Sequence, residues 1–205
     1  MRRWERVAKR AVDVAGATVG LAVSAPLIAA AAVLIKREDG GSVFFRQERV
    51  GEGGRTFRVL KLRTMVENAE GKGAGYAVDE GDPRILKVGD LLRRTSIDEL
   101  PQFWNVLVGD MSLVGPRPTL RYQVEQYDER QRRRLDVKPG VTGWAQVNGR
   151  ASVPWPERIE MDVWYVEHQS LRLDAEIVAR TIATLVSRDG TYKGEAGGWQ
   201  AGGSA

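Results

Sequence analysis

The stretch that decides how this chain folds is VAGATVGLAVSAPLIAAAAVLI, residues 14–35, which carries no charged side chain. Basic residues flank it on both sides: Arg2, Arg3, Arg6, Lys9 and Arg10 before it, Lys36 and Arg37 after it. As one helix these residues would cover roughly 33 Å, which is enough to cross a hydrocarbon core of about 30 Å. A cleavable signal peptide is the alternative, but the run is long for one and no convincing cleavage site follows. We expect this segment to enter a membrane.

A proline in the middle of this segment opens a second interpretation. Pro26 cannot donate an amide hydrogen to the carbonyl of Ala22, so the helix should kink or break there. Ser24 is placed to bond a carbonyl freed by the break. The part from Pro26 to Ile35 would reach only about the bilayer midplane, at roughly 15 Å, and both flanks are basic. A re-entrant hairpin with both ends in the cytoplasm satisfies these features, although spanning helices also contain prolines, so the residues alone leave both topologies open.

Composition limits the chemistry that the rest of the chain can perform. Its 205 residues suit one ordinary domain with an appendage, and the excess of 31 Lys and Arg over 27 Asp and Glu suits phosphates or anionic lipid without requiring either. The absence of cysteine excludes disulfides and thiolate chemistry, and the single histidine, His168, to which we assign no role, excludes a His-rich metal site. Catalysis would have to use carboxylates, hydroxyls or lysine.

The soluble part combines a hairpin with helices. Residues 42–49 and 56–62 alternate apolar and polar side chains around Gly51–Gly54, which predicts two paired strands. Asp82-Pro83 predicts the start of a helix, with Asp82 as its cap. Apolar side chains at helical spacing then predict one face of this helix and two further helices: Ile85, Val88, Leu91 and Leu92; Phe103, Trp104, Leu107 and Val108; and residues 173–186.

These patterns predict an α+β membrane protein in three parts. Residues 1–37 form the membrane segment with its basic flanks, residues 38–190 a mainly helical domain with one β-hairpin, and residues 191–205 a flexible glycine-rich tail. Arg130, Arg132, Arg133 and Arg134 are interpreted as a solvated helix face rather than a nucleic-acid site. The tryptophans at 104, 144, 155 and 164 fit either the membrane interface or the core.

Two adjacent carboxylates, Asp98 and Glu99, precede a predicted helix in the stretch TSIDELPQ, residues 95–102. Pro101 is tolerated only in the first turn of a helix, so the helix should begin near Asp98. Asp98 would then simply cap the helix, and Glu99 would complement its dipole. The same position also attracts phosphate, and diverging side chains would allow one carboxylate to attack while the other holds a metal. Both interpretations stay open on the residues alone.

Cationic and amide side chains elsewhere form a set suited to phosphate. Lys61 and Arg63 end the second strand, and Arg117 lies between the rigid prolines Pro116 and Pro118. A restrained backbone lowers the cost of presenting the guanidinium of Arg117 to a phosphate. A turn-rich loop, KPGVTGWAQVNGR at residues 138–150, supplies Gln146, Asn148 and Arg150. Each cation taken alone is more often a surface charge.

Taken in order, these motifs resemble the bacterial sugar transferases, the small monotopic phosphoglycosyl transferases. The resemblance covers roughly residues 1–187 and rests on Ser24-x-Pro26, FFRQERVG at 44–51, KLRTM at 61–65, DELPQ at 98–102, GDMS at 109–112, GPRP at 115–118 and the 138–150 loop. Leu62 departs from the Phe of many members but is also apolar. The resemblance implies the re-entrant form of the first helix, attached at the cytoplasmic face of the bacterial inner membrane.

The resemblance also implies an activity. A sugar-1-phosphate moves from a nucleotide diphosphate sugar, expected to be a UDP-sugar, to a polyprenol phosphate such as undecaprenyl phosphate, with release of UMP. Asp98 is implied as the nucleophile of a covalent aspartyl intermediate and Glu99 as a Mg²⁺ ligand. Substrate-binding residues are implied or expected at Lys61, Arg63, Pro116, Arg117, Pro118, Gln146, Asn148 and Arg150.

The implied reaction would be the first membrane step in assembling a polysaccharide or glycoconjugate. The expected partners are the two substrates and membrane lipids, without nucleic acid. The sequence leaves open the sugar, the base, the pathway and the oligomeric state, a homodimer included. Two rivals remain: direct attack by the lipid phosphate with Asp98 as general base, and a non-catalytic scaffold that binds acidic lipid.

Overall fold

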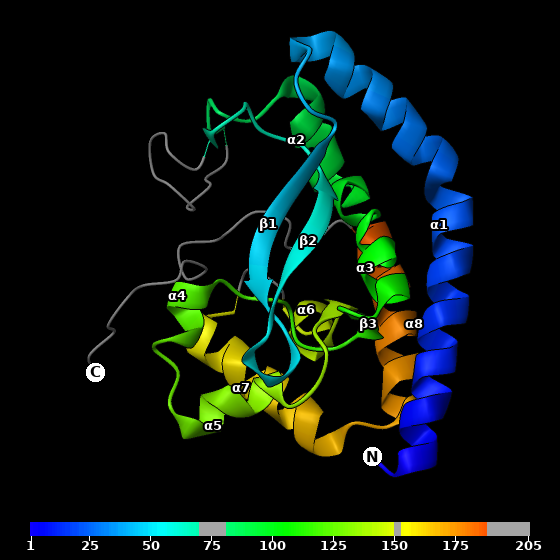
Figure 1. Ribbon diagram of the computed structural model, residues 1–205, viewed down its shortest axis with the longest axis vertical. Helices are drawn as coiled ribbons and strands as arrows, with labels where there is room; N and C mark the ends of the chain where they lie inside the picture. The colour runs from blue at the N-terminus through cyan, green and yellow to red at the C-terminus, as the bar shows by residue number, and fades with distance from the viewer. Residues whose placement is uncertain (70–80, 150–152, 188–205) are drawn as a thin grey trace.

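The computed structural model describes residues 1–69, 81–149 and 153–187, and Figure 1 shows a long helix lying beside a mixed helical and β domain. The elements, in chain order, are α1 (Arg3–Asp39), β1 (Phe44–Val50), η1 (Glu52–Gly54), β2 (Thr56–Leu62), α2 (Lys87–Arg94), η3 (Ile97–Glu99), α3 (Gln102–Val108), β3 (Ser112–Val114), α4 (Arg121–Val124), α5 (Glu129–Arg132), η4 (Arg133–Leu135), β4 (Gly140–Thr142), α6 (Trp144–Val147), α7 (Trp155–His168) and α8 (Leu171–Ser187). The expected α+β class is confirmed. The predicted tail, 191–205, lies outside the described residues.

The predicted division of the first segment into two helices at Pro26 is wrong, because α1 continues through this residue from Arg3 to Asp39. The helix is nevertheless bent, and in Figure 1 its C-terminal third turns over the domain. A proline in a helix removes one hydrogen bond and crowds the preceding turn, which bends a helix without having to end it. Ser24 is buried and bonds the carbonyl of Leu21, at 3.4 Å, rather than that of Ala22.

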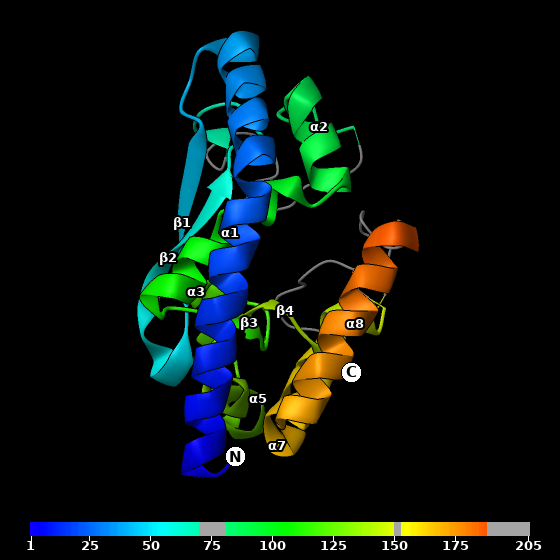
Figure 2. The same ribbon diagram turned by 90° about the vertical axis from the view of Figure 1, so that its right-hand side faces the viewer.

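The same domain holds α1 near both of its ends. Near the N-terminus, Lys9 Nζ lies 2.6 Å from a carboxylate oxygen of Asp174 in α8. Near the C-terminus, the carboxylate of Glu38 accepts hydrogen bonds from the backbone amides of Lys87 and Val88, at 2.6 and 2.9 Å. The described chain therefore folds along the length of α1, with the β-hairpin on one side and α7 and α8 on the other (Figure 2).

Two glycines let the middle of α1 approach the domain closely. A Cβ atom added to Gly16 would lie 2.6 Å from Leu113 Cδ1, and one added to Gly20 would lie 2.9 Å from the ring of Phe103. Ala17, between them on the same face, is fully buried. The outward face is different: Val23 is 72% exposed, although the segment is long and apolar enough to cross a membrane.

The β-hairpin forms where the alternation predicts it. β1 and β2 pair antiparallel, with Phe45 opposite Lys61 and Arg46 opposite Leu60. Because successive side chains point to opposite faces of a strand, Lys61 and Leu60 lie on different faces of the hairpin. Lys61 faces the domain interior, where it meets Glu99.

The predicted start of the next helix is wrong. Asp82 does not cap a helix; its carboxylate binds the guanidinium of Arg84, and α2 begins only at Lys87. Ile85 pairs instead with Met65 in an isolated β-bridge. The Asp-Pro pair therefore marks a turn, which the same residues also favour.

A short parallel pair, β3 and β4, brings two loops together. Ser112 lies opposite Gly140 and Val114 opposite Thr142. The Gly115–Pro118 segment follows β3 directly, and α6 follows β4. Backbone bonds continue the pairing, since the amide of Gly140 donates to the carbonyl of Pro116 at 2.9 Å.

One member of the arginine run is not solvated. Arg134 is 3% exposed and pairs with the buried Asp162 of α7 at 2.5 Å. The other arginines fit the expected surface role, since Arg130 and Arg133 bind exposed carboxylates of α7. The spacing of the run gave no indication that Arg134 alone turns inward.

Candidate active site

Asp98 and Glu99 lie on η3, a single 3-10 turn that precedes α3. Pro101 occupies the N-cap position of α3, so neither carboxylate caps this helix. Ser96, just before the turn, adopts a left-handed backbone with φ 57° and ψ 17°. A non-glycine residue in this conformation is uncommon, and such strained positions are enriched at active sites. The turn presents both carboxylates to the domain interior.

Glu99 is the centre of a charge cluster drawn from three parts of the chain. Its Oε1 atom accepts hydrogen bonds from Lys61 Nζ and from an Arg117 guanidinium nitrogen, both at 2.7 Å. Its Oε2 atom has one longer contact, 3.5 Å, with Arg117. The fold thus brings together Lys61, Glu99 and Arg117, which the sequence analysis selected from separate motifs.

The two neighbouring carboxyl groups differ strongly in proton affinity. Burial raises the pKa of Asp98 to about 6; the charge of Lys61 opposes this effect and the charge of Glu99 adds to it. Burial would also raise the pKa of Glu99, but the charges and hydrogen bonds of Arg117 and Lys61 outweigh it and lower that pKa. These contacts favour the ionised form of Glu99. Asp98 is 8% exposed, and no described residue pairs with its carboxylate.

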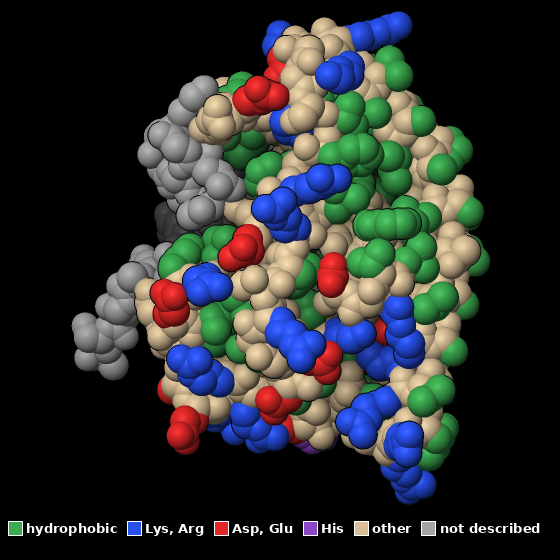
Figure 3. All heavy atoms as spheres, in the orientation of Figure 1, with side chains coloured by type: hydrophobic (Ala, Val, Ile, Leu, Met, Phe, Trp, Pro, Cys, Tyr) green, Lys and Arg blue, Asp and Glu red, His purple; other side chains and the backbone are tan. Residues whose placement is uncertain are grey.

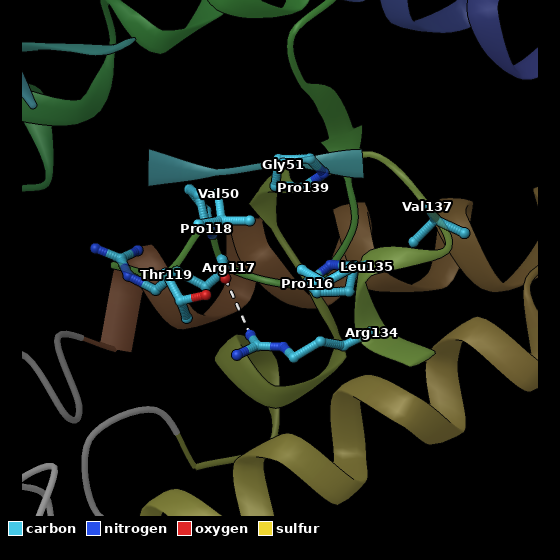
Figure 4. A pocket seen from close by; sticks show the side chains of 10 residues that line it. All are labelled: Val50, Gly51, Pro116, Arg117, Pro118, Thr119, Arg134, Leu135, Val137 and Pro139. Atoms are coloured by element: carbon cyan, nitrogen blue, oxygen red, sulfur yellow. Dashed lines mark hydrogen bonds between the residues drawn. The ribbon is translucent and has the colours of Figure 1, made fainter. Parts of the chain in front are cut away.

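The backbone that carries Arg117 is held on several sides. Figure 4 shows the guanidinium of Arg134 pointing at the Arg117 carbonyl, to which it donates at 3.0 Å. Arg49 donates to the carbonyl of Pro118 at 3.4 Å, and the amide of Val50 donates to that of Thr119 at 2.9 Å. These contacts fix the Pro116–Pro118 segment relative to β1 and η4, leaving the Arg117 side chain to face Glu99.

The other predicted substrate-binding residues are not brought into this cluster. Arg63 is 4% exposed and binds Asp39 and the Ser42 carbonyl, so it joins the end of α1 to β2. Gln146 donates to the carbonyl of Val141 at 3.0 Å, and Asn148 accepts from Arg180 at 3.0 Å. Arg150 lies outside the described residues.

The sequence analysis missed Arg93 of α2. One guanidinium nitrogen, NH1, is buried and has no hydrogen-bond partner among the described residues. The positive charge of Arg93 lowers the pKa of Asp98, which places the two groups within electrostatic reach. Burying a donor without an acceptor costs free energy, so an anion that accepted a hydrogen bond from this nitrogen would stabilise the site. Its position five residues before Asp98 was the only signal in the sequence.

A divalent cation fits this site only with help from a substrate. Among the described residues no group of three or more acidic or histidine side chains is placed to hold a metal. Mg²⁺ binding through one or two carboxylates together with phosphate oxygens is the usual arrangement at phosphate sites. Glu99 suits that role, because it is ionised and its Oε2 atom makes only one long contact.

The fold and the site combine an apolar helix long enough to enter a membrane with two adjacent carboxylates among cations, an arrangement suited to phosphoryl transfer. The sequence matches the family described as bacterial sugar transferase over residues 4–188. The chain belongs to this family, as its motifs predicted.

Characterised relatives include carrier-lipid transferases. The chain is 47% identical over 185 residues to the UDP-N-acetylgalactosamine-undecaprenyl-phosphate N-acetylgalactosaminephosphotransferase of Aeromonas hydrophila, a match that covers 87% of this chain and 44% of the relative. It is 44% identical to the UDP-glucose:undecaprenyl-phosphate glucose-1-phosphate transferase of Caulobacter vibrioides, over 90% of this chain and 72% of the relative. An uncharacterized sugar transferase of Bacillus subtilis, EpsL, is 42% identical over 90% of both chains.

Proposed function

We propose that this chain transfers a sugar-1-phosphate from a UDP-sugar to undecaprenyl phosphate, releasing UMP. The names of two relatives combine a UDP-sugar with undecaprenyl phosphate, and they differ in the sugar, so the sugar of this chain is left open. The reaction would begin the membrane-bound assembly of a polysaccharide or glycoconjugate. Relatives named as exopolysaccharide production proteins support that placement.

The observation that carries this proposal is the difference in surroundings between Asp98 and Glu99. Both cations of the cluster, Lys61 and Arg117, bind Glu99, whereas the carboxylate of Asp98 has no partner among the described residues. Desolvation raises the pKa of Asp98 to about 6, so at neutral pH the group is mostly ionised yet more basic than an ordinary aspartate. A desolvated, more basic carboxylate is the better nucleophile of the two.

The proposed reaction has two displacements at one phosphorus atom. An oxygen of Asp98 attacks the phosphorus that carries the sugar, and the bond to the bridging oxygen breaks, which releases UMP with that oxygen. The product is an aspartyl phospho-sugar. A phosphate oxygen of the lipid then attacks the same phosphorus and displaces the carboxylate, which restores Asp98 and yields the lipid diphosphate sugar. Covalent catalysis divides one difficult transfer into two easier steps.

The surrounding cations stabilise the charge that moves during these steps. Arg117 and Lys61 lie next to the nucleophile on a restrained backbone, and preorganised donors of this kind lower barriers because they need no rearrangement. Arg93 offers its unpaired nitrogen to a phosphate oxygen. Glu99 would hold Mg²⁺, which when bound neutralises the charge of a diphosphate.

We also propose that α1 attaches the protein to the cytoplasmic face of the inner membrane without crossing it. Its two ends are fastened to one folded domain through Lys9 and Glu38, and a helix that spanned the bilayer would separate them. Its outward face is apolar, with Val19 and Val23 strongly exposed. The site would then lie where a water-soluble donor and a lipid phosphate can both reach it.

The test is the intact mass of the protein. We expect wild-type protein mixed with its UDP-sugar, without acceptor lipid, to gain the mass of one sugar-phosphate group after rapid quenching, with one equivalent of UMP released. Asp98→Asn should show neither, because the amide cannot attack. Asp136→Asn, an exposed aspartate without a side-chain contact among the described residues, is the matched control and should behave as wild type.

Two further measurements complete this test: the thermal stability of the variant, and initial rates with both substrates varied. Neutral asparagine removes a buried charge, so Asp98→Asn should melt no lower than wild type, which separates chemistry from misfolding. Absence of an adduct under turnover conditions, together with intersecting double-reciprocal lines when both substrates vary, would instead establish direct transfer in a ternary complex. Full activity of Asp98→Asn would exclude Asp98 as the nucleophile, and absence of both UMP release and sugar-phosphate transfer by the folded wild-type protein would leave only the scaffold role.

A further inference from the structure

A hollow lies between the β-hairpin, formed by β1 and β2, and α3. It measures about 280 Å³ and is lined by Arg46, Arg58 and Leu60 of the hairpin together with Trp104, Asn105, Val108 and Asp110 at α3. We call this hollow the hairpin groove. The hairpin wall carries two cations, and Trp104 and Val108 add an apolar surface to the α3 wall, a combination that suits an amphipathic ligand with an anionic head.

The hairpin groove is separate from the candidate active site. Arg46 lies opposite Leu60 in the pairing register, and Arg58 is two residues before Leu60, so all three share one face of the hairpin. Lys61, which binds Glu99, lies on the other face because side chains alternate along a strand. A ligand head in the groove therefore cannot present its phosphate to Asp98, which argues against the acceptor lipid as occupant.

The two arginines of the groove are available for an anion. Both are exposed, and no described side chain or carbonyl pairs with either guanidinium. Asp110 is the one acidic residue lining the groove, and its carboxylate accepts a 3.4 Å hydrogen bond from Asn105. The formal charge of the lining is thus +1, two arginines less one aspartate, which matches a single phosphodiester.

The apolar part of the α3 wall continues toward the outward surface of α1. Trp104 is 53% exposed, and Val108, one turn further along α3, is exposed to the same degree. The neighbouring Phe103 packs on Gly20, so α3 lies directly against α1. Figure 3 shows cationic side chains over the hairpin beside a hydrophobic surface that extends to α1 at the edge of the molecule.

We propose that the hairpin groove binds an anionic phospholipid, with Arg46 and Arg58 on its phosphodiester and Trp104 and Val108 against the first part of its acyl chains. This lipid would be a resident of the membrane rather than a substrate. It would fix the depth and rotation of the domain against the bilayer, because it ties the side of the domain next to α1 to the headgroup layer.

The experiment uses Trp104 as the reporter. The full-length protein in detergent micelles is titrated with phosphatidylglycerol brominated near the start of its acyl chains, or with phosphatidylcholine brominated in the same way. The part of the tryptophan fluorescence quenching that is present in wild type and absent in Trp104→Phe is assigned to the groove. We expect phosphatidylglycerol to bind more tightly, by roughly fivefold for each arginine that it contacts. Arg46→Gln/Arg58→Gln should remove the preference, and Arg46→Lys/Arg58→Lys should largely keep it.

Controls separate this proposal from the proposed reaction. Arg55→Gln, which removes an exposed charge of the hairpin turn outside the groove, should leave the lipid preference unchanged. Arg46→Gln/Arg58→Gln should still form the aspartyl adduct, since neither residue contacts the site. Equal quenching by brominated phosphatidylcholine or phosphatidylethanolamine would overturn the proposal, as would wild-type phosphatidylglycerol binding by the folded double glutamine variant.

Discussion

Two adjacent carboxyl groups acquire opposite properties at the scale of single residues. Glu99 receives both neighbouring cations and stays ionised, whereas Asp98 is left desolvated beside a fixed negative charge. Environments that separate the pKa values of paired groups are a common mark of catalytic sites. The difference arises from which side chain reaches Lys61 and Arg117, not from the residue types.

The raised pKa of Asp98 predicts the pH dependence of the first half-reaction. In the proposed mechanism the ionised group attacks, so kcat/KM for UMP release should be lost as the pH falls through about 6 and should level off above it. An ordinary aspartate would lose activity only near pH 4. Single-turnover UMP release from pH 4.5 to 8 measures the midpoint, and a midpoint near 4 would contradict the desolvated environment.

The unpaired nitrogen of Arg93 predicts a role in donor binding or transfer. Arg93→Gln should lower kcat/KM by roughly 100-fold, the cost typical of losing one preorganised donor. Arg94→Gln is the matched control, because its side chain is exposed and pairs with Asp90 on the surface of α2. Steady-state rates with a UDP-sugar decide the matter, and equal activity of both variants would exclude Arg93 from the site.

Among the elements, α1 combines one face that packs on the domain with an exposed apolar face. Its inner face uses glycine and alanine, which bring its backbone close to α3 and β3, while its outer face uses valine and leucine. Small residues at a helix contact allow this approach. Gly16 and Gly20, four residues apart on one face, therefore form a packing surface.

This packing predicts a one-sided sensitivity of α1. Gly20→Leu should clash with Phe103 and lower the free energy of unfolding by about 1–3 kcal/mol, the usual cost of overpacking. Ala22→Leu, two residues away on the exposed face, should have little effect. Thermal melting of both proteins in the same detergent compares them, and equal losses would show that the inner face does not pack as described.

The whole molecule constrains how it can lie in a membrane. Because Lys9 and Glu38 bind the same domain, we predict that both ends of α1 lie on one side of the membrane. The chain has no cysteine, so single cysteines can be labelled cleanly. We expect Arg3→Cys and Arg37→Cys to react with a membrane-impermeant maleimide from the cytoplasmic side, and Val23→Cys to react only after solubilisation. Labelling of the two ends from opposite sides would establish a span.

The sequence by itself determined the apolar helix, the β-hairpin, the carboxylate pair and Arg117 as a phosphate-binding candidate. Charge patterning, alternation and proline placement are local properties, so neighbouring residues suffice to reveal them. These motifs also indicated the family that the comparisons confirm. Local patterns did not fix the continuity of α1 through Pro26, because packing against the domain can keep a bent helix intact where propensity favours a break.

Only the tertiary structure decided which charged groups meet. Arg63 and Arg117 are both arginines in promising motifs, yet one binds Asp39 at the end of α1 and the other binds Glu99. Arg134 turned inward to support the Arg117 backbone, and Arg93 was left with a free donor beside Asp98. Such pairings join residues far apart in the chain. Their partners depend on burial and distance in the folded state, which no local spacing encodes.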